Sequence, residues 1–217
     1  MPKLKKRALL LLVVLAMLPA SLYGCTGGTE PTPPGASESG SQPSAAQTGE
    51  LPPNGNSVTV GIAQDLDDLD PQLAKTAGIR EVLFNIFEGL VKASPDGSVI
   101  PAVASDYELS EDGTTYTFTL REGVTFHNGN PVTAEDVVYS LERCAGSENE
   151  GTPLVSAFSN VSSIEASGDN QVVITLAEPS TEFINSLTAA IIPKDSGATI
   201  ATDLIGTGPF QFVSYAP

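Results

Sequence analysis

Strict alternation of apolar and polar residues in two stretches most constrains how this chain can fold. Tyr, Phe and Leu alternate with threonines over residues 115–120, and Val, Ile and Leu alternate with other residues up to residue 176. A period of two is typical of a strand with one buried face. Each stretch follows four residues that favour a tight turn, Ser110–Gly113 and Ser167–Asn170. We therefore expect two hairpins, one pairing residues 107–109 with 115–120 and one running from residue 161 to 176.

Helical spacing appears in two other places. Apolar residues recur every three or four positions from Ile79 to Leu90, which predicts an amphipathic helix. Thr133 can cap a second helix whose first turn carries Glu135 and Asp136, with Val137, Val138 and Leu141 on its buried side. Shorter patterns predict a turn at 94–97, a helix at 181–187 and strands at 58–62 and 208–215. The expected fold class is mixed α/β with hairpins and packed helices, not a regular βαβ array.

The N-terminus has the order of a secretory signal. A basic cluster at residues 3–7 precedes an apolar run, Ala8–Leu18, and small residues lead to Cys25. The run is too short for a spanning helix, which needs roughly 20 apolar residues. Residues 22–25 resemble a bacterial lipobox, so we expect residues 1–24 to be removed and Cys25 to be lipidated. The alternative is an ordinary cleaved signal followed by an incidental cysteine.

The next segment, residues 25–56, is expected to be the lipidated cysteine and a disordered tether. It is rich in Gly, Ser, Thr and Pro and has almost no large apolar side chains, so it cannot offset its ordering entropy. Cleavage after residue 24 would leave six basic and 26 acidic residues, a formal net charge of -20. Such a chain is not expected to bind nucleic acid or anionic lipid headgroups.

The residues for metal or cofactor chemistry do not form a known pattern. The acidic run Asp65–Asp70 fails as a calcium loop of the EF-hand type, because Asp70 and Thr76 occupy the positions of its glycine and its last glutamate. A solvated loop is the expectation there, with a looser calcium site as the alternative. His127 is the sole histidine, so the usual zinc and nickel ligand sets cannot be assembled, and a role in shaping a turn is expected.

No motif for catalysis is present either. The sequence has no G-x-S-x-G elbow, no phosphate-binding loop of the Walker type and no dinucleotide fingerprint. Cys144 is expected to be a small, partly buried hydrophobe, with a functional thiol as the alternative. We therefore expect no metal, no cofactor and no enzymatic activity.

A set of short segments recurs in a recognisable order along residues 57–217. These segments are Leu69–Pro71, Glu88–Val91, Asp112–Gly113, Tyr116–Phe118, Leu120–Val124, Phe126–Gly129, Pro131, Thr133–Val137, Gly206–Phe210 and Ser214–Tyr215. Together they resemble family 5 of the extracellular solute-binding proteins, the oligopeptide-, dipeptide- and nickel-binding components of ABC importers. The resemblance implies the type II periplasmic-binding-protein architecture, in which two lobes enclose a ligand. By analogy this chain supplies most of lobe I only, and we expect a truncated gene or a fragment.

The resemblance also implies a function and a loose position for the site. A peptide or similar small organic solute is the expected ligand, because the segments that map to the cleft wall are small and uncharged and contain no arginine for an anionic nickel chelate. Plain packing is the alternative for these residues. The expected partners are ABC permease subunits and the membrane, reached through the acyl anchor, and the protein is expected to be an extracytoplasmic monomer at the cell surface or in the periplasm. The other reading is a truncated surface lipoprotein without transport activity. The cleft-wall candidates are Ala77, Gly78, Ile79, Thr188, Ala189 and Ala190.

Overall fold

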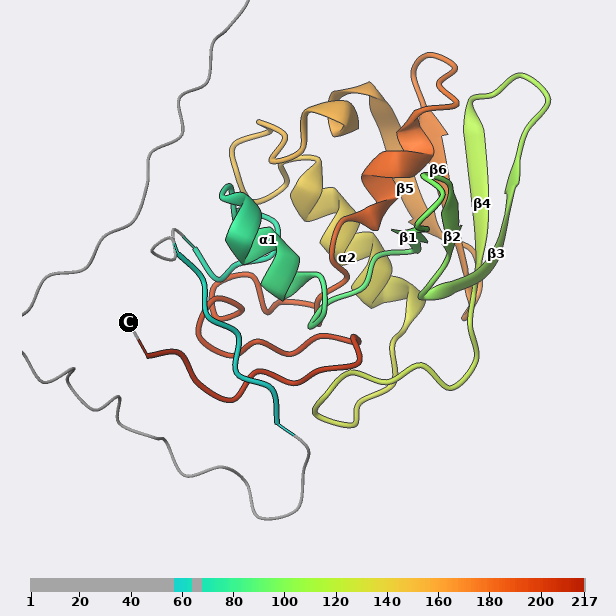
Figure 1. The fold of residues 1–217 in the computed structure, drawn as a ribbon. Coiled ribbons are helices and arrows are strands. Elements are labelled where there is room, and N and C mark those ends of the chain that lie inside the picture. Colours follow the sequence, from blue (N-terminus) through green and yellow to red (C-terminus); the bar gives the residue numbers. More distant parts are fainter. Residues whose placement is uncertain (1–56, 64–67, 217) are drawn as a thin grey trace, which may run out of the picture. The chain divides into compact units, whose positions relative to one another are not determined.

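The structure, a computed structural model, describes residues 57–63 and 68–216. Helices and antiparallel strands are mixed along the chain, which confirms the expected fold class (Figure 1). In chain order the elements are α1 (Ala77–Leu83), β1 (Val91–Ala93), β2 (Val99–Pro101), β3 (Ala104–Leu109), β4 (Thr115–Leu120), α2 (Ala134–Cys144), the 3-10 helix η1 (Ser156–Asn160), β5 (Val161–Ala166), β6 (Gln171–Leu176) and the 3-10 helix η2 (Phe183–Thr188).

The two predicted hairpins are present and join into one antiparallel sheet with the strand order β3-β4-β6-β5. Tyr107 lies opposite Phe118 in the first hairpin, and Phe118 lies opposite Val172 where β4 pairs with β6. A separate two-stranded sheet forms from β1 and β2, joined by the predicted turn in which Gly97 donates to the carbonyl of Ser94. The sequence indicated each hairpin, and the β4–β6 pairing joins them.

The alternating residues of β4 and β6 form the centre of the main hydrophobic core. Phe118, Val172 and Ile174 are fully buried, while the threonines between the apolar residues of β4 are only partly buried. Helix α2 packs against β5 and β6 and adds Val137 and Leu141 to the same core (Figure 1). Removal of this apolar surface from water is the main stabilising contribution to the fold.

Helix α2 begins at Thr133, as the sequence predicts. The backbone N–H of Asp136 donates to the Thr133 hydroxyl at 3.2 Å, and the Thr133 backbone N–H donates to the Asp136 carboxylate at 2.9 Å. This reciprocal capping box satisfies two amide groups that have no acceptor inside the helix. The other carboxylate oxygen of Asp136 accepts from the backbone of Lys194 at 2.8 Å, so the helix start is also tied to a distant segment.

The first helix is shorter than the apolar spacing predicts. α1 ends at Leu83, although Phe87 and Leu90 are buried as expected. In a longer helix the carbonyls of Asn85 and Ile86 would accept from residues 89 and 90; here they accept from the N–H groups of Phe210 and Gly208, at 3.1 and 2.8 Å. Tertiary hydrogen bonds thus replace helical ones, and the chain leaves the helix while its apolar residues still enter the core.

The strands expected at residues 58–62 and 208–215 are not formed, and both predictions are wrong for this structure. Val58, Val60 and Val213 are 66, 61 and 63% exposed, and within the described ranges no strand pairs with either segment. Alternation indicates which face a strand would bury, but a strand forms only when a neighbour accepts its backbone hydrogen bonds.

The segments expected to be the signal peptide (1–24) and the lipidated tether (25–56) lie outside the described residues, as does Cys25. Among residues 57–63 and 68–216, no helix has the length and hydrophobicity needed to cross a bilayer. The third expected segment, the domain from residue 57 onward, contains all the helices and strands described above.

Replacing Thr133 by alanine should lower the free energy of unfolding by about 1 kcal/mol, because the hydroxyl that accepts from the Asp136 N–H is lost. Urea denaturation followed by circular dichroism measures this change. Thr181→Ala is the matched control, since Thr181 is exposed and lies in no helix cap or strand; its effect should stay within about 0.5 kcal/mol. Equal effects of the two substitutions would contradict the role of the capping box.

Candidate ligand-binding surface

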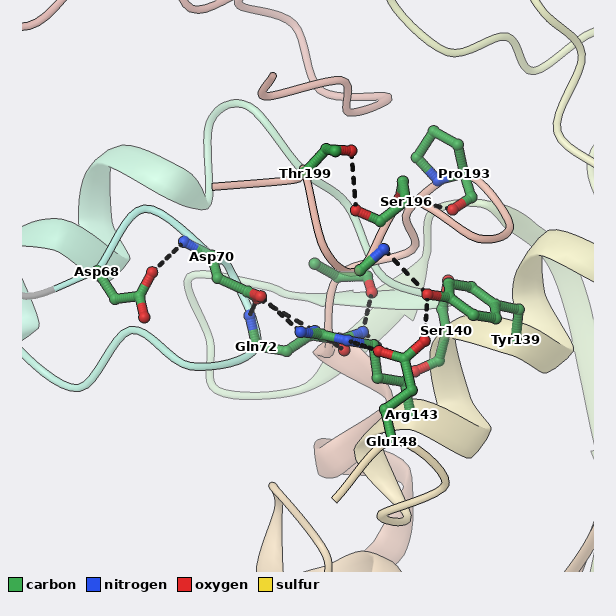
Figure 2. Close-up of polar contacts among 12 residues, drawn as sticks. Asp68, Asp70, Gln72, Tyr139, Ser140, Arg143, Glu148, Pro193, Ser196 and Thr199 are labelled. Carbon is green, nitrogen blue, oxygen red and sulfur yellow. Dashed lines mark hydrogen bonds and ion pairs between the residues drawn. The ribbon is translucent and has the colours of Figure 1, made fainter. Parts of the chain in front are cut away.

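A buried ionic network joins the loop before α1 to the last turn of α2 (Figure 2). Arg143 donates to both carboxylate oxygens of Asp70, at 2.6 and 3.2 Å, in the bidentate geometry that suits a guanidinium. The same guanidinium donates to the side-chain oxygen of Gln72 at 2.7 Å and to the Glu148 carboxylate at 2.9 Å. Two segments that are far apart in sequence, the loop at residues 70–72 and the end of α2 with Glu148, therefore meet at one side chain.

The charges in this network compensate one another. Burial works to lower the pKa of Arg143, but hydrogen bonds and charge from Asp70, and then from Glu148, outweigh it and raise that pKa above the usual arginine value. The Asp70 and Arg143 side chains are only 4 and 6% exposed, so each would be costly to bury alone. The loop is thus fixed by a fully charged pair.

The expectation that residues 65–70 form a solvated loop is wrong at Asp70. Its backbone N–H donates to the Asp68 carboxylate, and its side chain faces Arg143 instead of solvent. Asp65 and Asp67 lie outside the described residues, and the part of the chain that the structure describes holds no cluster of three or more metal-ligating side chains. Sequence reasoning missed Arg143, because it lies two positions after Leu141 and so on another side of α2 from the apolar face that the spacing indicated.

Gln72 links this network to the second group of candidate cleft-wall residues, those at 188–190. Its side-chain nitrogen donates to the carbonyl of Ser140 in α2 at 3.1 Å and to the carbonyl of Ala190 at 2.9 Å. The Ser140 hydroxyl oxygen accepts from the backbone N–H of Ile192 at 2.9 Å. The segment from residue 188 to residue 192, here called the 188–192 segment, is therefore bonded to both the α1 loop and α2.

The opposite side of the 188–192 segment packs against the chain after α1. The backbone N–H of Ile191 donates to the carbonyl of Glu88 at 2.9 Å. Gly89 passes so close to residues 187–189 that a side chain there would collide with their backbone. Glycine is required at this position by the close approach of two backbones.

The six candidate wall residues are only partly brought together. Ala77 is exposed and Gly78 half-buried at the start of α1, while Thr188 and Ala189 are half-buried at the end of η2. Ile79 and Ala190 are buried in the same apolar cluster, 2 and 8% exposed. An open hollow of about 310 Å³ lies beside the first stretch alone, lined by Gly61, Ile62, Ala63, Thr76, Gly78, Ile79 and Glu81.

His127 shapes a turn, as expected, and also holds a second loop. Gly129 donates to the carbonyl of Phe126 within the turn. The Gly206 N–H donates to Nδ1 of His127 at 3.3 Å, which leaves Nε2 as the protonated nitrogen that faces the Gly208 carbonyl at 2.9 Å. Both ring nitrogens are thereby used for structure in a neutral imidazole.

Cys144 is fully buried at the end of α2, which agrees with the expectation of a small apolar residue. Burial raises the pKa of its thiol to about 12. A reactive cysteine needs an accessible thiolate, so this environment makes Cys144 inert at neutral pH.

Comparison with known families gives a match over more than half of the chain. The family model described as "Bacterial extracellular solute-binding proteins, family 5 Middle" matches residues 98–217. The glutathione-binding protein GsiB of Pectobacterium atrosepticum is 31% identical over 165 residues, which cover 73% of this chain and 32% of that protein. GsiB of Salmonella typhimurium is 32% identical with the same coverage. The chain thus spans about a third of the length of these relatives.

Solved structures of similar fold cover a similar share of the chain. The ABC transporter-associated periplasmic binding protein DppA from Helicobacter pylori, in complex with the peptide STSA, is similar with a TM-score of 0.62 and 28% identity, covering 70% of this chain and 35% of that one. NikZ from Campylobacter jejuni, in complex with Ni(L-His), gives a TM-score of 0.62 at 25% identity, covering 70% and 32%. These are proteins of solute binding and transport, not enzymes.

The Cys144 thiol should resist iodoacetamide at pH 8 in the folded protein and react once the protein is unfolded in urea, because its thiolate is disfavoured by burial. A Cys25→Ser background leaves a single thiol to count by mass spectrometry. Rapid alkylation of the folded protein at pH 8 would show that Cys144 is accessible and ionised.

Proposed function

The chain belongs to family 5 of the bacterial extracellular solute-binding proteins, and on that premise we propose that it captures a solute outside the cytoplasm for an ABC importer. The observation that supports this most directly is the family match together with a fold shared with solute-loaded relatives. The proposed partners are a small ligand and the permease subunits, and the protein is proposed to act as a monomer. Solute capture and delivery involve a conformational change and no chemical step.

We propose peptides or similar small organic molecules as the solutes. Relatives with this fold bind a peptide, glutathione or a histidine complex of nickel, according to their names. Among the described residues, the hollow beside α1 is lined by glycine, alanine and isoleucine residues, Thr76 and the charged Glu81. The carboxylate of Glu81 favours a ligand with a positive group over an anionic one. Shape and backbone groups of the six candidates, Ala77, Gly78, Ile79, Thr188, Ala189 and Ala190, would supply the remaining contacts.

The proposed location is the outer face of the cytoplasmic membrane, with Cys25 as the lipidated anchor. The basic and apolar order of residues 3–18 and the lipobox-like residues 22–25 support this proposal. Residues 26–56 would then hold the binding domain away from the lipid surface, and the strong negative charge of the chain would keep it from adhering to anionic headgroups.

Deleting the gene in its source bacterium should abolish uptake of at least one solute from a panel of radiolabelled glutathione, tri-alanine and longer peptides, because capture precedes transport. Reintroducing the gene should restore that uptake. Unchanged uptake of every solute in the deletion strain would contradict the transport function and favour a surface lipoprotein without transport activity.

Substituting Cys25 by serine should release the protein from the membrane fraction into the medium, because the thiol that accepts the lipid is gone. Immunoblots of membrane and medium fractions measure the change, and Cys144→Ser is the control that keeps the anchor cysteine. Equal membrane retention of the Cys25→Ser variant and the unmodified protein would show that another feature anchors the chain.

A further inference from the structure

We propose that Gln72 is a positioning residue, which fixes the spacing between the two candidate wall segments at the start of α1 and at residues 188–190. This inference rests on the proposed function, since it gives the spacing a role in ligand capture. It adds a residue that makes no contact with the hollow beside α1 and that no motif in the sequence indicates.

The orientation of the Gln72 carboxamide is determined by its partners. Arg143 can only donate hydrogen bonds, so the group that it contacts at 2.7 Å is the side-chain oxygen of Gln72. The side-chain nitrogen therefore faces the carbonyls of Ser140 and Ala190, and each of its two hydrogens has an acceptor. No rotation of the amide by 180° preserves this arrangement.

Arg143 is itself held in place, so it restrains Gln72 and does not follow it. Asp70 binds the guanidinium bidentately and also accepts the backbone N–H of Gln72 at 2.9 Å, and Glu148 contacts a third nitrogen. Glu148 in turn accepts from the Tyr139 hydroxyl at 2.6 Å, whose oxygen accepts from the backbone of Gly197 at 3.0 Å (Figure 2). The buried part of this network, Asp70, Gln72 and Arg143, is held by several hydrogen bonds to each side chain and is therefore rigid.

The loop that carries Gln72 leads directly into the first wall segment. The backbone N–H groups of Leu73 and Ala74 donate to the carbonyl of Asp70, which forms a turn, and Thr76 then begins α1. The bond from Gln72 to Ala190 is thus a short side-chain link between the entry to α1 and the 188–192 segment. Changing this bond should move the two wall segments relative to each other, while the four-stranded sheet stays as it is.

Two substitutions separate the donor function of Gln72 from its bulk. Gln72→Met keeps a side chain of similar length but leaves the Ser140 and Ala190 carbonyls without a donor. Gln72→Glu keeps the acceptor for Arg143 and places carboxylate oxygen against those two carbonyls. Gln171→Met is the matched control, because Gln171 lies at the start of β6 on the sheet and is only partly buried.

Hydrogen–deuterium exchange of the full chain measures the local effect without a ligand. In both Gln72 variants, amide exchange at Ile191 and Ile192 should rise roughly tenfold or more, the effect of losing a buried hydrogen bond, while β4 and β6 stay within about twofold. Gln171→Met should leave the 188–192 segment unchanged. Unchanged exchange at Ile191 and Ile192 would overturn the inference, and so would an equal rise in every segment, which indicates general destabilisation.

Uptake kinetics connect the spacing to ligand capture. In cells that carry the Gln72 variants at wild-type protein levels, the apparent KM for the transported solute should rise roughly tenfold with little change in maximal rate, since the site is misplaced and not removed. Altered exchange with an unchanged KM would overturn the role in ligand capture. The deletion strain tests the proposed transport function by itself, because unchanged uptake there contradicts that function. The exchange experiment tests the role of Gln72 and does not depend on transport.

Discussion

The contact between Arg143 and Asp70 is the interaction on which the candidate surface depends. Burial of either charge alone would be unfavourable by several kcal/mol, so neither the α1 loop nor the end of α2 can move without the other. The pair joins residues separated by 73 positions. Around it, Gln72 and Glu148 accept further hydrogen bonds from the guanidinium, and the network becomes a fixed point for the surrounding backbone.

Backbone contacts carry the rest of the arrangement. The carbonyls at the end of α1 accept from the 208–210 segment, and the carbonyl of Glu88 accepts from Ile191. Gly206 and Gly208 lie so close to the backbone of residues 85–86 that a side chain at either would collide with it. The glycine-rich run at residues 206–208 is therefore a packing element, and His127 binds it through both ring nitrogens.

The similar structures cover about 70% of the chain but only about a third of their own lengths. Under the proposed function, the surface described here would provide one wall of a ligand site. This wall would consist of small side chains and backbone, and the charged network would hold it in place.

The sequence by itself determined the local elements: both hairpins, their turns and the capped start of α2. Each follows from interactions between residues close in sequence, such as the reciprocal bonds of Thr133 and Asp136. It also indicated the family, because the order of short motifs along the chain can be recognised without a structure. Only the tertiary structure decided where α1 ends, that the segments at 58–62 and 208–215 form no strand, and that Asp70 is buried against Arg143. Those outcomes depend on partners that lie far along the chain, and periodicity carries no information about such partners.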